Sequence, residues 1–536
     1  MLRTSAAVTV ALGAALLTSA PAAAQSPPVF AAPQVLANEG RHAVTAMGPA
    51  GDVIVAWAGT QRGVFAARRA ALGGRFATPV QVSDDRVSFL APLRLARNDR
   101  GDVALAWIRE AGGQDAPGVL RVALAAAGTT AFGPPEDAVS APSVGDPALA
   151  IGDGGEVALA FEVLAPDGKA DAYGVLRPAG GPVGRPALLG RRVLGRGAQL
   201  AAGPGGTLHA LWVAETSELG RPATSAAFTA EASPGSGFGA PRRLSDPALT
   251  AGNGYVTPQL VANRRGDLLA AWAGSPPFSG PFQTRADVAT RPAGGDWSAA
   301  GDVAGPHKAV LSVSPVLNDR GDAVVSWGNL SHVETIFRPA GGAFGGLFNT
   351  QVVASPDFDG MAVALDALGI ALIVRRQVVG HAGGPGRIHV LLRARAEVPG
   401  PDIPVSGVEE AISSPAIATD PFGNGIVVWS SGGSARPVTA VAYSATAPVV
   451  ARVRAGSREL RFRANEPANV RITVRRDVRH GKSATQTAVA RPGANNVRYV
   501  SKVRALLRRK GRYVATIRAR DAGPRSATVK LRFRRR

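Results

Sequence analysis

A unit that recurs every 48 to 60 residues restricts this chain of 536 residues to repeat architectures. Each unit has a polar turn that closes on glycine and then an apolar strand, with an aromatic residue six positions after the glycine in seven of the eight copies. The turn glycines are Gly51, Gly101, Gly155, Gly206, Gly266, Gly321, Gly369 and Gly423. Six of the seven Trp residues occupy the aromatic position. Short strands at this period predict a four-stranded propeller blade in each unit rather than a helical solenoid.

The fourth predicted strand of a unit opens with an apolar-x-x-Pro signature, as in Phe76/Pro79 and Phe132/Pro135. Proline suits an edge strand, so this strand should form the outer rim. The eighth unit lacks it, but the same signature stands at Phe30/Pro33, near the start of the chain. We therefore predict an all-β fold: an eight-bladed β-propeller over residues 25–449, closed by an N-terminal strand that completes the last blade.

Residues 1–24 have the features of a secretory signal peptide. Arg3 precedes a short apolar run, and a small-x-small cleavage site ends at Ala24. No later stretch has the ~20 uninterrupted apolar residues that a transmembrane helix needs. We expect a secreted protein, extracellular or associated with the cell envelope.

The chain contains no Cys, which excludes disulfides, zinc-thiolate sites, iron–sulfur clusters and a Cys nucleophile. Its seven His residues show no paired metal-ligand spacing, and no phosphate loop or nucleophile elbow is present. We therefore predict no cofactor and no metal site.

The repeats resemble bacterial secreted β-propellers of the sialidase-like and NHL-like groups. The resemblance covers residues 28–449 by pattern. The sialidase Asp-box, Ser-x-Asp-x-Gly-x-Thr-Trp, is absent, because the repeat Gly and Trp lie six positions apart rather than three. Sialidase activity therefore does not follow from the resemblance.

Residues 450–536 follow a different pattern, in which apolar residues alternate with Arg, as in Leu460-Arg-Phe462-Arg. This alternation predicts strands with one buried face and a small antiparallel β-sandwich. The segment resembles bacterial Ig-like or fibronectin-III-like modules in Glu466-Pro-Ala468-x-Val470, Gly511-x-Tyr513 and Ala519-x-Asp521. The resemblance implies a spacer or an adhesive unit.

The basic excess of the chain belongs to this module alone. The formal net charge is +21, while residues 451–536 by themselves carry 26 Lys+Arg and 4 Asp+Glu. An Arg-rich strand face should bind a polyanion through salt-sensitive contacts; the alternative is a surface that only keeps the module soluble. Nucleic acid is not expected, because most of the module's few aromatic residues face inward. The candidate polyanion-binding residues are Arg461, Arg463, Arg471, Arg475, Arg518, Arg520, Arg532 and Arg534.

On the propeller, the loops after the repeat aromatic residues vary in length and should share a face with the channel mouth. Glu110, Glu162 and Glu215 stand at these loops on three consecutive units. Arg375 and Arg376 hold the corresponding place on the seventh unit, across the ring. An acidic arc opposite a basic pair predicts a ligand-binding site; the alternative is ordinary surface charge.

Two classes of function remain open. The first is a non-enzymatic binding protein, in which the propeller is a platform for a ligand, a glycan or a protein and the basic module anchors it to an anionic cell-envelope polymer. The second is an extracellular carbohydrate-active hydrolase or lyase with the propeller as its catalytic domain. Carboxylates that converge within ~5–10 Å at the channel mouth would favour the second.

Overall fold

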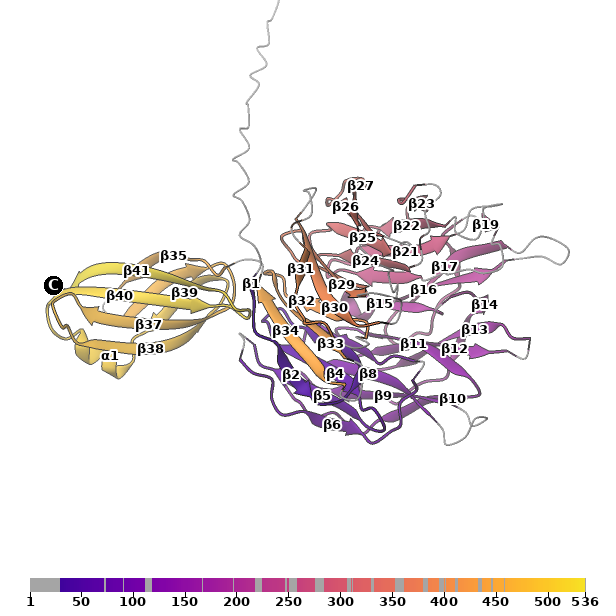
Figure 1. Ribbon diagram of the computed structural model, residues 1–536, viewed down its shortest axis with the longest axis horizontal. Coiled ribbons are helices and arrows are strands. Elements are labelled where there is room, and N and C mark those ends of the chain that lie inside the picture. Colours follow the sequence, from indigo (N-terminus) through magenta and orange to yellow (C-terminus); the bar gives the residue numbers. More distant parts are fainter. Residues whose placement is uncertain are drawn as a thin grey trace, which may run out of the picture.

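A computed structural model provides the structure of the chain (Figure 1). It describes residues 29–71, 74–89, 91–110, 118–165, 167–195, 197–216, 224–245, 248–249, 258–274, 284–305, 310, 312–328, 332–351, 361–378, 384–394, 400, 402–409, 413–431, 436–444, 447–456 and 458–535. The predicted signal peptide lies outside the described residues. In the described part of the chain, no helix is both long and apolar enough to cross a membrane.

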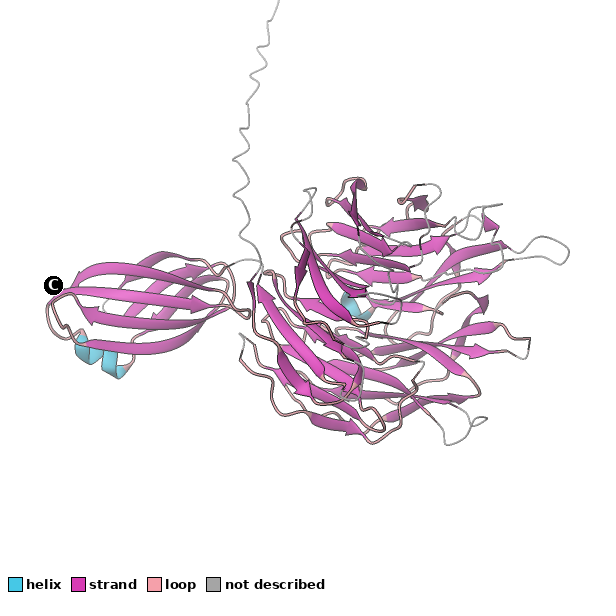
Figure 2. Ribbon diagram, viewed as in Figure 1, coloured by secondary structure: helices cyan, strands magenta, loops and turns pink. Residues whose placement is uncertain are grey.

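The repeats fold into four-stranded antiparallel groups, and the predicted all-β propeller is confirmed. Figure 2 shows that strands make up almost all of the regular structure. The first four groups are β3 (Arg41–Met47), β4 (Val53–Ala58), β5 (Val64–Arg69) and β6 (Val80–Ser83); β7 (Arg94–Arg97), β8 (Val103–Arg109), β9 (Gly118–Ala125) and β10 (Glu136–Ala141); β11 (Val144–Ile151), β12 (Val157–Leu164), β13 (Ala170–Arg177) and β14 (Ala187–Val193); and β15 (Gln199–Ala202), β16 (Leu208–Glu215), β17 (Thr224–Ala232) and β18 (Arg242–Arg243). A 3-10 turn, η1 (Pro204–Gly206), lies between β15 and β16, and β19 (Ala248–Leu249) also pairs with β17.

The later groups continue the pattern. They are β20 (Gln259–Ala262), β21 (Leu268–Gly274), β22 (Arg285–Arg291) and β23 (Gly301–Asp302); β24 (Ser312–Leu317), β25 (Ala323–Gly328), β26 (His332–Arg338) and β27 (Gly345–Gln351); β28 (Met361–Leu365), β29 (Ile370–Val378), β30 (Gly386–Ala394) and β31 (Asp402–Pro404); and β32 (Ala416–Thr419), β33 (Asn424–Ser430) and β34 (Val438–Ser444). Each first strand contacts the first strand of the next group, and β32 contacts β3, so these strands surround a central channel.

The last group is completed from the other end of the chain. Strands β1 (Val29–Phe30) and β2 (Gln34–Ala37) both pair antiparallel with β34. Phe30 lies opposite Tyr443, with ring centroids 5.9 Å apart. The N-terminal segment therefore covers the edge of β34, as the Phe-x-x-Pro signature predicts.

The repeat glycines and tryptophans hold the groups together. All eight turn glycines have positive φ, between 79° and 95°, which a side chain rarely tolerates. The six repeat Trp side chains are at most 4% exposed. Each packs against the preceding group, as Trp107 does against Ile54 and Ala56. The second strands are buried on both faces for this reason, which explains why their sequences are almost continuously apolar.

The C-terminal part is a sandwich of two sheets. One sheet contains β35 (Val450–Ala455), β36 (Glu459–Ala464) and β39 (Gly493–Arg498); the other has the order β38 (Ser483–Ala490), β37 (Ala468–Arg476), β40 (Gly511–Arg520) and β41 (Ser526–Arg535). The alternating apolar residues form its core, including Leu460, Ile472 and Ile517. A short helix, α1 (Ser501–Leu506), which the alternation does not predict, adds Val503 to this core.

The sandwich contacts the propeller at the eighth group. Asn424 Nδ2 donates to Glu466 Oε2 at 3.1 Å, and Ser444 Oγ donates to Asp521 Oδ2 at 2.8 Å. Arg525 Nε donates to the carbonyl of Ser444 at 3.1 Å. Glu466 and Asp521 are fully buried in this junction.

Candidate functional site

One sheet of the sandwich presents a strongly basic outer face. Because strand residues alternate between faces, the outward positions of β37, β40 and β41 share one surface. It carries six of the eight predicted polyanion-binding residues, all exposed: Arg471, Arg475, Arg518, Arg520, Arg532 and Arg534. We call this surface the arginine face.

The pairing register brings like charges together on the arginine face. Arg471 lies directly opposite Arg518, and Arg512 lies directly opposite Arg534. Like charges in opposite positions destabilise a sheet. Within the described residues, no carboxylate lies within 4.0 Å of the six predicted arginines to offset this repulsion. A depression of about 730 Å³ lies among Arg471, Arg518 and Arg520.

The other two predicted residues, Arg461 and Arg463, lie on β36 in the opposite sheet. Arg461 Nη2 is 2.6 Å from Glu459 Oε1, so its charge is already partly compensated. The alternation identifies outward positions but not which sheet each strand joins. The structure therefore divides the predicted set between two faces.

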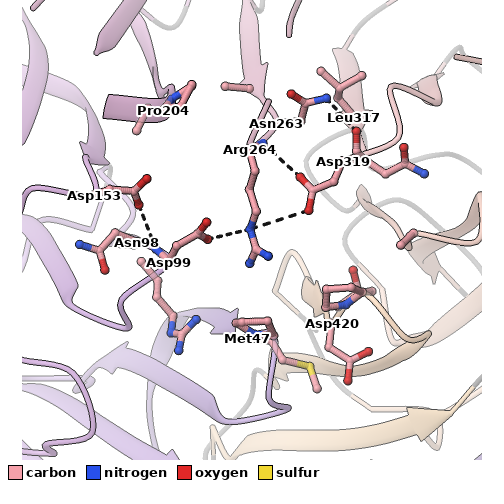
Figure 3. Close-up of a pocket in the computed structure, with 18 of the residues that line it drawn as sticks. Met47, Asn98, Asp99, Asp153, Pro204, Asn263, Arg264, Leu317, Asp319 and Asp420 are labelled. Atoms are coloured by element: carbon pink, nitrogen blue, oxygen red, sulfur yellow. Dashed lines mark hydrogen bonds and ion pairs between the residues drawn. The ribbon is translucent and has the colours of Figure 1, made fainter. Parts of the chain in front are cut away.

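A pocket of about 310 Å³ lies at the channel mouth formed by the glycine turns (Figure 3). Arg264 extends between two carboxylates from other repeats: its Nε is 2.8 Å from Asp99 Oδ1 and 3.7 Å from Asp319 Oδ2. The backbone N–H of Asp99 donates to Asp153 Oδ1 at 3.3 Å. Asp420 also lines the pocket, and burial raises its pKa to about 6.

This mouth brings acids together but places a cation between them. Asp99 and Asp319 both contact the same guanidinium nitrogen, so the two carboxylates converge on one cation. The guanidinium of Arg264 already pairs with both of them. The pocket therefore suits binding of a polar ligand better than acid–base chemistry. Sequence reasoning missed Asp99, Arg264 and Asp319, although each directly follows the Asn that opens its glycine turn. Their shared position in the repeat was the signal that could have found them.

The predicted propeller residues lie toward the opposite mouth, because the second strand of each group runs away from the glycine turn. Glu110 Oε2 is 2.8 Å from Arg86 Nε. Glu215 Oε1 lies 2.7 Å from Lys169 Nζ, and its Oε2 lies 2.9 Å from Arg192 Nε. The hydrogen bond from Lys169 contributes most to lowering the pKa of Glu215. These two acids are engaged by different local partners.

Arg375 holds the Trp position of the seventh group and is only 4% exposed. It contacts Asp402, whose Oδ2 is also 3.1 Å from His389 Nδ1. Arg376 donates from Nη2 to the carbonyl of Gly384 at 3.1 Å. Arg375 thus substitutes a buried ion pair for the aromatic packing of the other repeats.

Glu162 differs from the other predicted acids. Burial, with a further contribution from Asp146, raises its pKa to about 8. The backbone N–H of Gly197 hydrogen-bonds its carboxyl group, while Oε1 is buried without a hydrogen-bond partner. The raised pKa favours the neutral, protonated form of Glu162 at neutral pH, and its Oε1 has no hydrogen-bond partner among the described residues.

Among the described residues, no group of three or more His, Asp or Glu is arranged to hold a metal ion. No family model matches the sequence, and no curated protein matches it.

Solved structures similar to this chain share little sequence with it. A protein of unknown function from Dyadobacter fermentans is 14% identical, with a TM-score of 0.37 over 66% of this chain and 93% of that one. A fungal alcohol oxidase of the AA5 family, in complex with copper, is 11% identical, with a TM-score of 0.42 over 95% and 99%. An ulvan lyase of family PL25 is 10% identical, with a TM-score of 0.43 over 69% and 96%. At these TM-scores the likeness carries no argument about function.

Proposed function

We propose that this chain is a secreted binding protein. An eight-bladed propeller, closed by β1 and β2, is the platform for a ligand, and the C-terminal sandwich holds it on an anionic polymer of the cell envelope. The arginine face carries this proposal. It places exposed guanidinium groups in register on one sheet, although the repulsion between them opposes folding.

The geometry of the arginine face matches an extended polyanion. Neighbouring strands lie ~4.8 Å apart and outward residues on one strand ~6.7 Å apart, so charges recur in two directions. Arginine binds carboxylate, phosphate and sulfate groups in a bidentate manner. Each contact releases counterions, so affinity should fall steeply as salt rises.

The test measures binding of the full chain to polygalacturonate over a series of salt concentrations, with neutral dextran as the reference polymer. A double variant, Arg471→Gln and Arg518→Gln, should weaken binding and lower the slope of log affinity against log salt by about one unit per residue. The matched control is Arg461→Gln with Arg463→Gln, which removes the same charge from the other sheet and should retain most of the affinity. Equal losses in the two double variants would show that net charge, not the arginine face, binds the polymer.

A carbohydrate-active hydrolase or lyase is the second candidate, and Glu162 is the observation that favours it. A carboxylic acid that keeps its proton at neutral pH has the property of a general acid. Release of new sugar ends from a panel of polysaccharides by the native protein, abolished by Glu162→Gln, would support this function. Release that Glu162→Gln leaves unchanged would reject Glu162 as the acid.

A further inference from the structure

The depression on the arginine face is lined by side chains that can donate hydrogen bonds. They are three guanidinium groups, one amide and two hydroxyls, which belong to Arg471, Arg518, Arg520, Asn469, Thr487 and Ser526. Neither Asp nor Glu is among the described residues that line it. A depression that offers donors and positive charge without a carboxylate selects an anionic ligand.

The pairing register of β37 and β40 places the three guanidinium groups in one small block. Arg471 lies opposite Arg518, and the neighbouring outward pair is Asn469 opposite Arg520. Directly opposite residues have Cβ atoms ~4.5–5.5 Å apart, and outward neighbours on one strand lie ~6.7 Å apart. The three guanidinium groups, on long side chains, can therefore reach a single bound group together.

The two hydroxyls flank this block on the outer strands of the sheet. Thr487 on β38 lies opposite Arg471, and Ser526 on β41 lies opposite Arg520. Both residues are exposed, as are the three arginines, so a ligand can reach all five side chains from solvent.

The charges of the depression have no local counter-charge. Among the described residues, no carboxylate lies within 4.0 Å of Arg471, Arg518 or Arg520. Asp521, on which Arg520 acts, is fully buried in the junction with the propeller and is not among the residues that line the depression. A bound anion would therefore offset repulsion that the chain itself leaves in place.

Three guanidinium groups around one depression match a phosphate monoester better than a carboxylate. A carboxylate offers one negative charge and two acceptor oxygens. A phosphate monoester carries a charge of about −1.5 to −2 at pH 7 and offers three strong acceptor oxygens. The volume of about 730 Å³ exceeds what a phosphate group fills, so the depression also has room for the molecule that carries it.

We propose that the depression binds a phosphate monoester, carried by a sugar or by a lipid headgroup. The guanidinium groups of Arg471, Arg518 and Arg520 bind the phosphate oxygens, and the flanking hydroxyls bind polar groups of the carrier. This site rests on the proposed function of the arginine face and names the anionic group that the face binds most tightly.

Calorimetry on the full chain compares D-glucose 6-phosphate with D-glucuronate, which carries a carboxylate on the same sugar frame. The phosphate should bind about tenfold or more tightly at pH 7, because it engages all three arginines. Replacement of Arg520 by Gln (Arg520→Gln) should remove most of this preference. The matched control is Arg498→Gln, which removes an exposed arginine from β39 in the other sheet and should leave the affinity unchanged. An equal loss in the two variants would overturn the site, since net charge would then explain the binding.

The pH dependence of binding identifies the charge state of the ligand. All charged residues of β37, β38, β40 and β41 are Arg or Lys, which stay protonated between pH 5 and 8. A phosphate monoester gains a proton near pH 6, so affinity for glucose 6-phosphate should fall as pH drops through about 6. Affinity for glucuronate should stay constant over this range, because carboxylates titrate near pH 4. A phosphate affinity that does not change with pH would overturn the match to the doubly charged group.

Vesicles distinguish the two carriers. Phosphatidylcholine vesicles that contain phosphatidate present the same monoester on a lipid, and vesicles that contain phosphatidylglycerol present a diester as the reference. Binding of glucose 6-phosphate in solution supports a sugar carrier, and binding only to phosphatidate vesicles supports a lipid headgroup. The site is overturned if glucose 6-phosphate binds no more tightly than glucuronate and phosphatidate vesicles bind no more tightly than the reference.

The outcomes also separate this site from the polyanion proposal. Salt-sensitive binding of polygalacturonate that Arg471→Gln with Arg518→Gln weakens, without any preference for phosphate, would keep the envelope anchor and reject the phosphate site. Phosphate binding that depends on Arg520, without binding of polygalacturonate, would keep the phosphate site and reject the binding of an extended polymer.

Discussion

At the scale of single residues, the main feature is that buried tryptophans donate hydrogen bonds to acidic side chains. The indole N–H of Trp107 donates to Asp85 Oδ2 at 2.8 Å, and that of Trp327 donates to Glu334 Oε2 at 2.6 Å. Arg121 adds two hydrogen bonds to Asp85. A buried indole needs an acceptor, and the acid in turn needs a cation.

Replacement of Asp85 by Asn should lower the free energy of unfolding by about 3 kcal/mol, because Arg121 and Trp107 lose a charged partner in a buried setting. Urea denaturation measures this change. Asp84→Asn, at the neighbouring exposed position, is the control and should leave the stability unchanged.

The effect of Asp85 should depend on pH. Burial raises its pKa, but the hydrogen bonds from Arg121, Ser83 and Trp107 outweigh burial, so the pKa lies below its usual value. The stabilisation is therefore complete above the ordinary Asp pKa of about 4 and is lost as pH falls through the lowered value. The difference between the native protein and Asp85→Asn should shrink on acidification, and a constant difference down to strongly acid pH would contradict this assignment.

At the scale of structural elements, the glycine turns connect neighbouring repeats through hydrogen bonds. Asn318 Oδ1 accepts from the backbone N–H of Asp322, and its Nδ2 donates to the carbonyl of Asp366 in the next repeat at 2.8 Å. Asn98 makes the same kind of bond to Gly152, and Asn263 to Asn318. Three Arg-Gly-Asp triplets, which begin at Arg100, Arg265 and Arg320, lie in these turns, and each Arg forms an ion pair with the Asp of its own triplet.

Asn318→Ala should destabilise the propeller by about 2 kcal/mol, since it leaves buried backbone groups unsatisfied in two repeats. Thermal unfolding followed by circular dichroism measures the loss. Leu368→Ala, at an exposed position of the next glycine turn, leaves the inter-repeat bonds intact and is the reference; an equal loss in both variants would refute the special role of Asn318.

Deletion of residues 29–37 should lower the melting temperature by roughly 5 °C or more, because β34 loses both of its outer partners and exposes an edge that favours aggregation. Differential scanning calorimetry and light scattering measure the two effects. A chain that begins at residue 29 serves as the reference. An unchanged melting temperature after the deletion would count against the N-terminal closure of the ring.

At the scale of the whole molecule, the junction between propeller and sandwich is rich in buried acids. Burial is the main cause that raises the pKa of Glu466 to about 8, and of Asp420 and Asp521 to about 6. Asn424 and Asp420 face Glu466, while Arg520 and Arg525 act on Asp521. Asp420 also lines the turn-side pocket, so the junction and the pocket share a residue.

These raised values predict a fold that is more stable in mild acid. Between the ordinary carboxyl pKa of about 4 and the raised values, the folded state binds more protons than the unfolded state, so stability falls as pH rises up to about 8. Glu466→Gln keeps the acceptor for Asn424 and should raise stability at pH 8 by an amount on the order of 2 kcal/mol, with little effect at pH 4. Calorimetry at both values measures this. A variant that is equally stabilised at both would mean that Glu466 is not protonated by burial.

Local sequence patterns are enough to predict the repeat, its strands and their buried faces. The eight glycines and six tryptophans recur at fixed spacing because every turn needs positive φ and every blade packs against its predecessor. The N-terminal signature predicts the pairing with β34 for the same reason: a strand edge needs a partner. Alternation likewise predicts the outward arginines of the sandwich.

The tertiary structure alone decided which of these residues meet. Local patterns set which way a side chain points from its strand, but closure of the ring sets which repeats face one another across the channel. Arg264 therefore reaches Asp99, 165 positions away. Strand order in the sandwich places Arg471 beside Arg518 and Arg461 on the other sheet. Such contacts depend on long-range packing: the repeat marks equivalent positions, but it does not say which copies of a position meet.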